Sequence, residues 1–239
     1  MELFREPIEY LKDYLADADK RKELQGTKCS MISSWPRGSS LVLQADTALE
    51  LGGAEGSLFI ILWTEQDGVI SPGQISLVGP DIQEAENKKL PVAQVILIHG
   101  AFRDEYETYQ LLLDTLLGVN LKDISVRFWP DRQRIWYRVS DKALINGFSL
   151  LRCGCTLLNR LQSLPAVKGA EIIISTESLT DHPFLKKAAA NSSKILEALI
   201  KIHEDLNFDC EDCDYKDVCD EVGALKAIHR RLEEERKDS

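Results

Sequence analysis

The sequence predicts an α+β fold, with a mixed sheet of short strands in the N-terminal two thirds packed by helices, and a helical C-terminal part. Before residue 140, apolar residues alternate with polar ones or form short apolar blocks, which is typical of strands. After residue 140 they recur every three or four positions, which is typical of helices. Because strands and helices are separated along the chain, an α+β fold is favoured over an alternating α/β fold.

The first quarter of the chain predicts one helix and two strands. Residues 7–24 carry apolar side chains at helical spacing within a heavily charged stretch, so we expect a peripheral helix. Alternation in residues 41–49 predicts a strand, and the apolar block of residues 57–63 predicts another. The glycines of residues 52–56 lie between these strands, so we expect them to form a hairpin turn.

The middle of the chain predicts more strands and one helix. Short strands are expected over residues 74–79 and 90–98, and the second is so apolar that we expect it to be covered on both faces. A helical stripe over residues 106–117 ends at a glycine, which is a common residue after a helix. Two further short strands are predicted over residues 124–129 and 135–139.

The last part of the chain predicts mainly helices. A long helix is expected over residues 140–164, a strand over residues 170–175 and a second helix over residues 182–206, followed by a cysteine-containing loop and a charged final helix. We therefore expect residues 1–165 to form an α+β domain. Residues 166–239 add a strand and helices, either as a second unit or continuous with the first.

Composition limits the classes of function. The 239 residues carry a net charge of −10 and a pI near 5.0, which argues against a general nucleic-acid binder. No apolar run approaches the roughly 20 residues that a membrane span needs. Six cysteines without a signal-like start favour a reducing cytoplasm over a secreted disulfide scaffold. We therefore expect a cytoplasmic protein that binds neither nucleic acid nor membrane.

Three cysteines near the C-terminus form the clearest chemical motif. Cys210, Cys213 and Cys219 have the spacing C-x2-C-x5-C within an acidic segment. Two thiols on one tight turn, with a third a few residues on, are typical of iron–sulfur and structural zinc sites. The alternative interpretation is a solvated acidic loop whose cysteines pair only on oxidation. We expect a metal or cluster site here.

The other three cysteines are expected in the core. Cys155 belongs to an apolar stripe at helical spacing, and Cys153 lies two residues away on the same predicted helix. Residues two apart on a helix point in nearly opposite directions, so these thiols do not converge on one ion. Cys29 lies in a short apolar segment and is also interpreted as a core residue. Cys29 or Cys153 remains a candidate for a fourth ligand through space.

A local excess of arginine contrasts with the acidic composition. Six arginines fall within 34 residues: Arg127, Arg132, Arg134, Arg138, Arg152 and Arg160. Trp129 and Trp136 lie among the first four. Guanidinium groups bind phosphate in a bidentate manner, and aromatic rings stack on planar groups. This pattern suits a coenzyme A-like anion or an acidic partner surface. The residues expected to bind the anion are Arg127, Arg132, Arg134, Arg138 and Trp136. The alternative is that the arginines form surface ion pairs within the protein.

Several short segments of the sequence together resemble a known family. Residues 40–53, 59–63, 74–81, 90–93 and 135–148, and then the cysteine motif, are similar to the acetyl-CoA synthase subunit of the carbon monoxide dehydrogenase/acetyl-CoA synthase complex. The resemblance extends over residues 25–222. It implies an iron–sulfur cluster of the [4Fe–4S] type at the three motif cysteines, with nickel as another possible metal, whereas the cysteine spacing also allows zinc. It implies carbon monoxide dehydrogenase or a corrinoid protein as partners, and the arginine pattern adds coenzyme A as an expected ligand.

The resemblance leaves three interpretations open. The first is an accessory protein of one-carbon and carbon monoxide metabolism that binds a cluster without a complete acetyl-forming site, since no further cysteine follows Cys219. The second is a minimal coenzyme A-dependent acetyl or methyl transferase. The third is a zinc-stapled interaction module. We expect that the chain alone does not synthesise acetyl-CoA.

Overall fold

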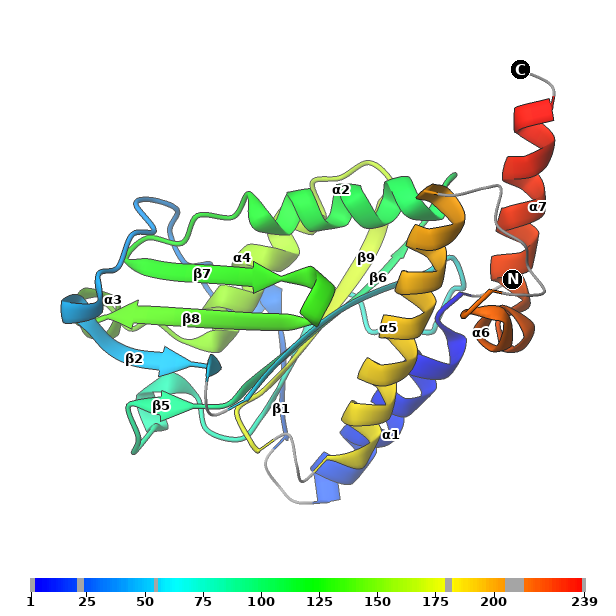
Figure 1. Ribbon diagram of the computed structural model, residues 1–239. Helices are drawn as coiled ribbons and strands as arrows, with labels where there is room; N and C mark the ends of the chain where they lie inside the picture. Colours follow the sequence, from blue (N-terminus) through cyan, green and yellow to red (C-terminus); the bar gives the residue numbers. More distant parts are fainter. Residues whose placement is uncertain (1–2, 21–23, 54–55, 179–181, 205–212, 238–239) are drawn as a thin grey trace.

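The computed structural model describes residues 3–20, 24–53, 56–178, 182–204 and 213–237, and it confirms the predicted α+β class (Figure 1). Two sheets of five and four strands lie side by side, with helices packed around the larger one. The larger sheet has the order β1-β4-β9-β6-β3. Its strands are β1 (Leu24–Lys28), β3 (Ser57–Thr64), β4 (Gln74–Val78), β6 (Val92–Gly100) and β9 (Val167–Ser175).

The larger sheet is mixed and forms the centre of the core. β4 runs parallel to β9, and β3 runs parallel to β6, whereas β6 and β9 are antiparallel. Every residue of β6 is buried, as its nearly all-apolar sequence predicted. β9 follows residue 165 in the chain and pairs with both β4 and β6. The C-terminal part of the chain therefore contributes an inner strand to the sheet built by the N-terminal part.

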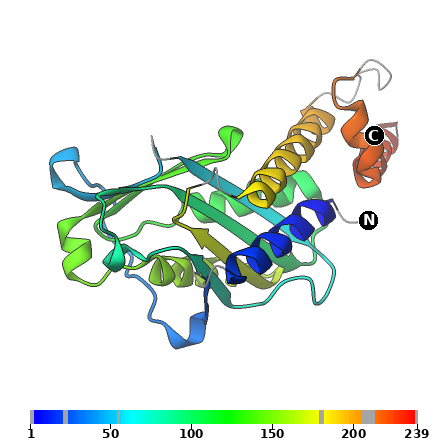
Figure 2. The ribbon, with the colours of Figure 1, turned by 90° about the horizontal axis from the view of Figure 1, so that it is seen from below.

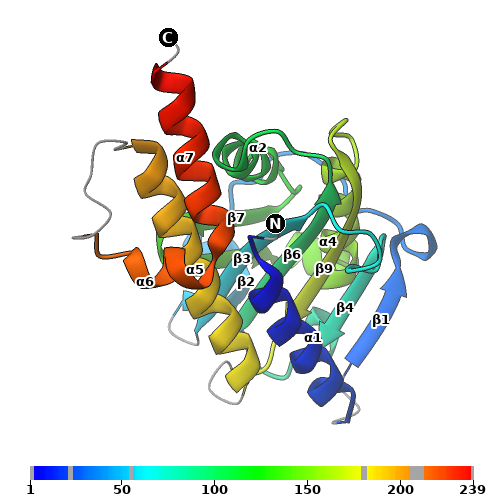
Figure 3. The ribbon, with the colours of Figure 1, turned by 90° about the vertical axis from the view of Figure 1, so that its right-hand side faces the viewer.

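Helices cover both faces of this sheet. α1 (Arg5–Lys20) and α5 (Pro183–Glu204) lie side by side on one face (Figures 2 and 3). α4 (Leu150–Leu161) packs against β4 and β9 on the other face, and α2 (Glu105–Leu117) packs on α4 and α5. Two charged helices, α6 (Lys216–Glu221) and α7 (Gly223–Lys237), follow and pack against α5.

The smaller sheet has one apolar and one polar face. Its order is β5 (Lys89–Leu90), β2 (Thr47–Leu51), β8 (Arg134–Ser140) and β7 (Ile124–Trp129). Ile135, Tyr137 and Val139 alternate along β8 and are fully buried. The Tyr137 hydroxyl donates a hydrogen bond to Oε1 of Gln94 on β6, so the two sheets are joined by a buried polar contact as well as by apolar packing.

The predicted strand over residues 41–49, and its hairpin with residues 57–63, are wrong. Residues 44–46 form a 3-10 turn, and the side chains of Leu41 and Leu43 are 77% and 58% exposed. The strand begins only at Thr47, and β2 pairs with β8 while β3 pairs with β6. The last six residues of β3 are buried, which suits pairing with β6 at the edge of the larger sheet, covered on both faces, and not a hairpin with the half-polar β2.

The single long helix predicted over residues 140–164 is also wrong. The chain forms α3 (Asp141–Ile145), a turn, and then α4. Gly147 in the turn has φ of 73°, and the Ser149 side chain accepts a hydrogen bond from Arg152 N at the start of α4. A left-handed glycine followed by a serine cap is a stop and a start signal. Apolar residues recur at helical spacing on both sides of this turn, so the periodicity alone does not reveal the break between α3 and α4.

Candidate functional site

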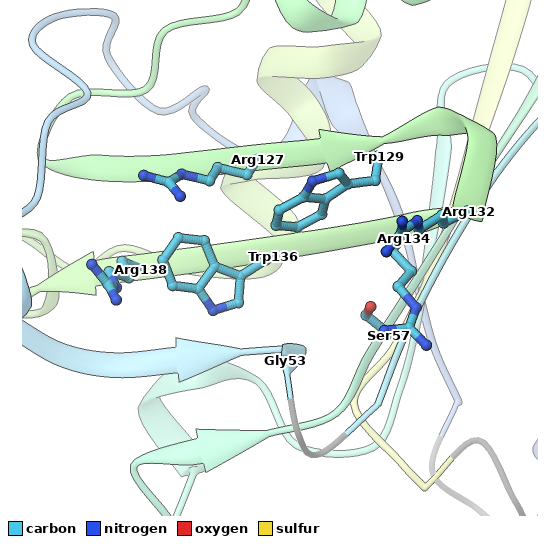
Figure 4. Close-up of a pocket in the computed structure, with 8 residues that line it drawn as sticks. All are labelled: Gly53, Ser57, Arg127, Trp129, Arg132, Arg134, Trp136 and Arg138. Carbon is cyan, nitrogen blue, oxygen red and sulfur yellow. The ribbon is translucent and has the colours of Figure 1, made fainter.

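The hairpin of β7 and β8 gathers the predicted arginines on one surface. Arg127 pairs with Trp136, and Trp129 pairs with Arg134, in the antiparallel register. Paired residues of antiparallel strands point to the same side of a sheet. Since Ile135 and Tyr137 fill the buried side, the arginines and tryptophans form the outward face of the hairpin (Figure 4).

These side chains line a cavity of about 470 Å³ on the outer face of the smaller sheet. Its lining residues are Gly53, Ser57, Arg127, Trp129, Arg132, Arg134, Trp136 and Arg138 (Figure 4). All five residues of the predicted anion site are therefore brought together. Gly53 follows β2 by two residues and Ser57 is the first residue of β3, so the end of one sheet's strand and the start of the other's form one wall of the cavity.

Trp136 is held in a fixed orientation within the cavity. Its indole Nε1 donates a hydrogen bond to Glu50 Oε1 at 3.0 Å. Arg138 Cζ lies 4.3 Å from the centre of the Trp136 ring, and Arg127 Cζ lies 5.3 Å from it. Cation–π contacts of this kind are favourable and restrict both groups. The tryptophan and two guanidinium groups are thus ordered before any ligand binds.

The cavity has an excess of positive charge. Arg138 Nε contacts Glu50 Oε1 at 3.4 Å. Within the described part of the chain, neither Arg127 nor Arg134 forms an ion pair with a carboxylate. The alternative interpretation, in which these arginines form ion pairs with the protein's own carboxylates, therefore holds for Arg138 but not for Arg127 or Arg134. Unpaired guanidinium groups around a cavity favour an anionic ligand.

The other two arginines of the cluster lie elsewhere. Arg152 donates to the backbone oxygens of Ser33 and Gly147, and its guanidinium lies 4.6 Å from the ring centre of Trp35. It therefore braces the start of α4 against the segment before it. Arg160 also lies on α4 and does not line the cavity.

The motif cysteines are only partly described. Cys210 lies outside the described residues. Cys213 and Cys219 are half-buried free thiols, Cys213 before α6 and Cys219 within it. The Tyr215 N–H donates a hydrogen bond to Cys213 Sγ at 3.5 Å. In the described ranges no group of three or more potential ligands surrounds a metal position, so the predicted ligand set remains a prediction.

Cys153 and Cys155 are core residues, as their helical spacing predicted. Both are buried, with relative exposure of 1% and 0%. Cys153 lies near the Tyr137 hydroxyl, which donates its hydrogen bond to Gln94, and burial raises the pKa of the Cys153 thiol to about 12. Cys155 lies against Cys29, with Cys155 Sγ 3.6 Å from the Cys29 carbonyl oxygen. The two thiols thus contact different partners.

Glu50 is the member of the site that sequence reasoning missed. It lies on β2 opposite Arg138 and holds both Arg138 and Trp136. The signal that could have found it is the burial alternation of residues 47–51, in which Leu49 and Leu51 point inward and Glu50 points outward. The predicted strand starts at Leu41, six residues before β2 begins, and this early start hides the alternation of residues 47–51.

The chain is an α+β module with an arginine-lined cavity, and comparison with known proteins identifies its family. The family of the CO dehydrogenase/acetyl-CoA synthase complex beta subunit matches residues 33–179, which is more than half of the chain. The chain belongs to this family, which confirms the resemblance found in the sequence. The matched range contains every residue that lines the cavity.

A curated relative agrees with this assignment. The carbon monoxide dehydrogenase/acetyl-CoA synthase subunit alpha of Moorella thermoacetica is 27% identical over 130 residues. The aligned region covers 53% of this chain and 17% of that protein, so the chain spans only a small part of its relative. None of the described helices is long and apolar enough to cross a membrane.

Proposed function

We propose that this chain binds coenzyme A, or a similar phosphorylated nucleotide-like anion, in the cavity formed by β7 and β8. The observation that carries this proposal is the pair of guanidinium groups, Arg127 and Arg134, that have no carboxylate partner in the described structure and face a shared cavity with Trp129 and Trp136. Arginine forks suit phosphate oxygens, and a tryptophan face suits a planar base.

The size and exposure of the cavity support the same proposal. A volume of about 470 Å³ falls within the range of roughly 300–1,000 Å³ that is usual for small-ligand sites. The Trp129 side chain is 41% exposed, so one ring face is accessible for stacking. Trp136 is fixed by Glu50, so little side-chain entropy is lost there on binding.

Family membership supports a role in one-carbon metabolism. We propose that the chain acts as an accessory protein of the carbon monoxide dehydrogenase/acetyl-CoA synthase system, with carbon monoxide dehydrogenase or a corrinoid protein as its partner. The relatives named above are components of that system. Binding of purified carbon monoxide dehydrogenase in a pull-down would support this role, and absence of binding with and without coenzyme A would count against it.

Calorimetric titration with coenzyme A at low salt tests the ligand. The double variant Arg134→Ala, Arg138→Ala should weaken binding by at least tenfold, because each charge-assisted hydrogen bond contributes about 1.5–3 kcal/mol. Arg230→Ala is the matched control, since Arg230 is an exposed arginine on α7 outside the cavity. Absence of heat at millimolar coenzyme A in the wild-type protein would reject the nucleotide-like ligand.

We also propose that Cys210, Cys213 and Cys219 bind a [4Fe–4S] cluster or a metal ion. The N–H···S hydrogen bond from Tyr215 to Cys213 supports this, because such bonds tune cluster sulfurs. These thiols would be the protein ligands, and a cluster bound there would supply electron transfer. Iron, nickel, zinc and sulfide should be measured after anaerobic purification. Iron together with sulfide indicates a cluster, and zinc alone indicates a structural zinc site.

Cysteine variants test the ligand set. Cys213→Ser should lose the metal, whereas Cys155→Ser should retain it and lose only stability, because Cys155 is buried in the core. Equal metal content in Cys213→Ser and wild-type protein would show that the assignment is wrong.

A further inference from the structure

A second cavity contains a thiol that the arginine site does not use. Cys29 lies directly after β1 and is half-exposed. It lines a cavity of about 450 Å³ with Lys28, Pro72, Gly73, Asn159 and other residues. The Cys29 N–H donates to Gly73 O at 2.8 Å, which holds the cysteine at the cavity wall. The Lys28 ammonium donates to Pro72 O at 3.3 Å, so a cation lines the same cavity as the thiol.

Directly behind Cys29 lies a second thiol. Cys155, near the middle of α4, is fully buried, and its Sγ lies 3.6 Å from Cys29 O. The Cys155 thiol thus donates a hydrogen bond to the Cys29 carbonyl oxygen, which places the two cysteines in direct contact. They are 126 positions apart in the sequence, so only the folded chain brings them together. One thiol is accessible from the cavity and the other is covered by it.

We propose that Cys29 and Cys155 form a thiol–disulfide exchange site that reacts with small disulfides carrying anionic groups, such as glutathione disulfide. The Cys29 thiolate attacks one sulfur of the small disulfide, and the S–S bond breaks. A Cys29 mixed disulfide forms, and one small thiolate leaves and takes up a proton. The Cys155 thiol then loses its proton to solvent or to a leaving thiolate, and its sulfur attacks Cys29 Sγ. The second small thiol is released, so two protein thiols become one internal disulfide while one small disulfide becomes two small thiols.

The order of the two steps follows from the surroundings of each sulfur. Cys29 meets the small disulfide first because it is the exposed member, and Lys28 provides a positive charge for the carboxylates of such a molecule. Burial, and then the Cys29 side chain, raise the pKa of Cys155 to about 12, so Cys155 is a poor nucleophile toward solvent reagents. Its direct contact with Cys29 supplies the proximity that the second step needs.

The test uses the reduced full-length protein and glutathione disulfide, followed by alkylation and peptide mapping. The wild-type protein should yield a cross-linked pair of peptides that contains Cys29 and Cys155. The Cys155→Ala variant should stop at a glutathione adduct on Cys29. Cys153→Ala is the matched control, because Cys153 is equally buried on the same helix but contacts Tyr137, and it should still form the Cys29–Cys155 disulfide.

Two results would overturn the proposal. The first is a stable glutathione adduct on Cys29 in the wild-type protein without the internal disulfide, which would show that Cys155 does not resolve it. The second is unmodified Cys29 under conditions in which Cys213, another half-buried free thiol, is modified. Circular dichroism of the Cys155→Ala protein distinguishes misfolding from loss of exchange, and Cys29→Ser should abolish the cross-link in a fold that is otherwise unchanged.

Discussion

Glu50 shows how a single carboxylate can order a basic site and also weaken it. It accepts a hydrogen bond from Trp136 and forms an ion pair with Arg138. The variant Glu50→Gln keeps an oxygen acceptor for the indole and removes the negative charge. We expect roughly two- to fivefold tighter binding of coenzyme A, the size of effect that a partly exposed ion pair produces. Titrations at several salt concentrations should show a steeper salt dependence, and weaker binding would mean that the orientation set by the Glu50 charge outweighs its repulsion.

Asp81 gives a prediction for stability against pH. It is buried, and one of its oxygens accepts hydrogen bonds from Ile82 N at 2.6 Å and Leu150 N at 2.8 Å. Burial raises the pKa of Asp81 in the folded protein. The folded state therefore holds the proton more tightly than the unfolded state does. Its stabilising contribution is complete below the ordinary aspartate range and is lost as pH rises through the raised pKa.

Asp81→Asn should remove this pH dependence. The variant keeps the acceptor oxygen without the charge, so its stability relative to wild type should increase as the pH rises from about 4 to about 7. Urea unfolding at both pH values measures the difference. Asp81→Ala loses both hydrogen bonds and should be destabilised by about 1–3 kcal/mol at pH 4, and this deficit should shrink toward pH 7 as wild type loses the contribution of Asp81. A constant difference between Asp81→Asn and wild type would contradict the assignment.

The sequence predicted the arginines of the cavity but not their geometry. Arg127, Arg134 and Arg138 were recognisable because four guanidinium groups interleaved with tryptophans are unusual in an acidic chain. The pairing of Arg127 with Trp136 depends on the register of β7 and β8, and the role of Glu50 depends on β2 lying beside β8. These are contacts between distant segments, and a local pattern does not contain them.

At the scale of elements, the chain is tightly constrained where β2 ends. Gly52 has φ of 85°, and a Cβ there would lie 2.6 Å from the Ile135 carbonyl oxygen. Gly73 has a similar φ of 74°, but a Cβ there would meet nothing within 4 Å. The two glycines thus share the same backbone strain but differ in the space around them.

We expect Gly52→Ala to destabilise the protein by about 3 kcal/mol and Gly73→Ala by about 1 kcal/mol, since only the first adds steric displacement of a neighbouring strand to the left-handed strain. Urea unfolding of the two variants measures both values. Gly52→Ala should also weaken coenzyme A binding, because Gly53 and Ser57 line the cavity. Equal losses of stability in the two variants would show that the contact with Ile135 does not constrain the turn.

Elements with a strong local signal were predicted well, and those that depend on partners were not. β7 was predicted with its observed bounds and α2 within one residue, because turns or a glycine mark their ends. The strand placed over residues 41–49 failed because Leu41 and Leu43 alternate with polar residues but lie exposed on a loop. Alternation alone does not show whether a neighbouring strand is present.

At the scale of the whole molecule, the two predicted sites lie at opposite ends. In Figure 1, β7 and β8 lie on the left, α6 lies on the right, and α5 lies between them; Figure 3 shows α6 and α7 in front and the smaller sheet behind. Cys219 lies on α6, which is thus on the other side of α5 from the hairpin that lines the arginine cavity. This separation does not favour a transferase in which one chain passes a metal-bound group directly to coenzyme A on its own arginines.

The same separation predicts that the two sites act independently within one chain. Energetic effects of changes at distant sites without shared partners usually add. Replacing Cys210, Cys213 and Cys219 together by serine should therefore leave the affinity for coenzyme A unchanged within about twofold. In the reverse direction, Arg134→Ala with Arg138→Ala should leave the metal content unchanged. Calorimetry and metal analysis on the same preparations measure both. If loss of the cysteines weakens coenzyme A binding tenfold in a folded protein, the two ends are coupled, and α5 is the element that connects them. It contacts α6, and its Ser192 hydroxyl accepts a hydrogen bond from Gln133 Nε2 beside the cavity.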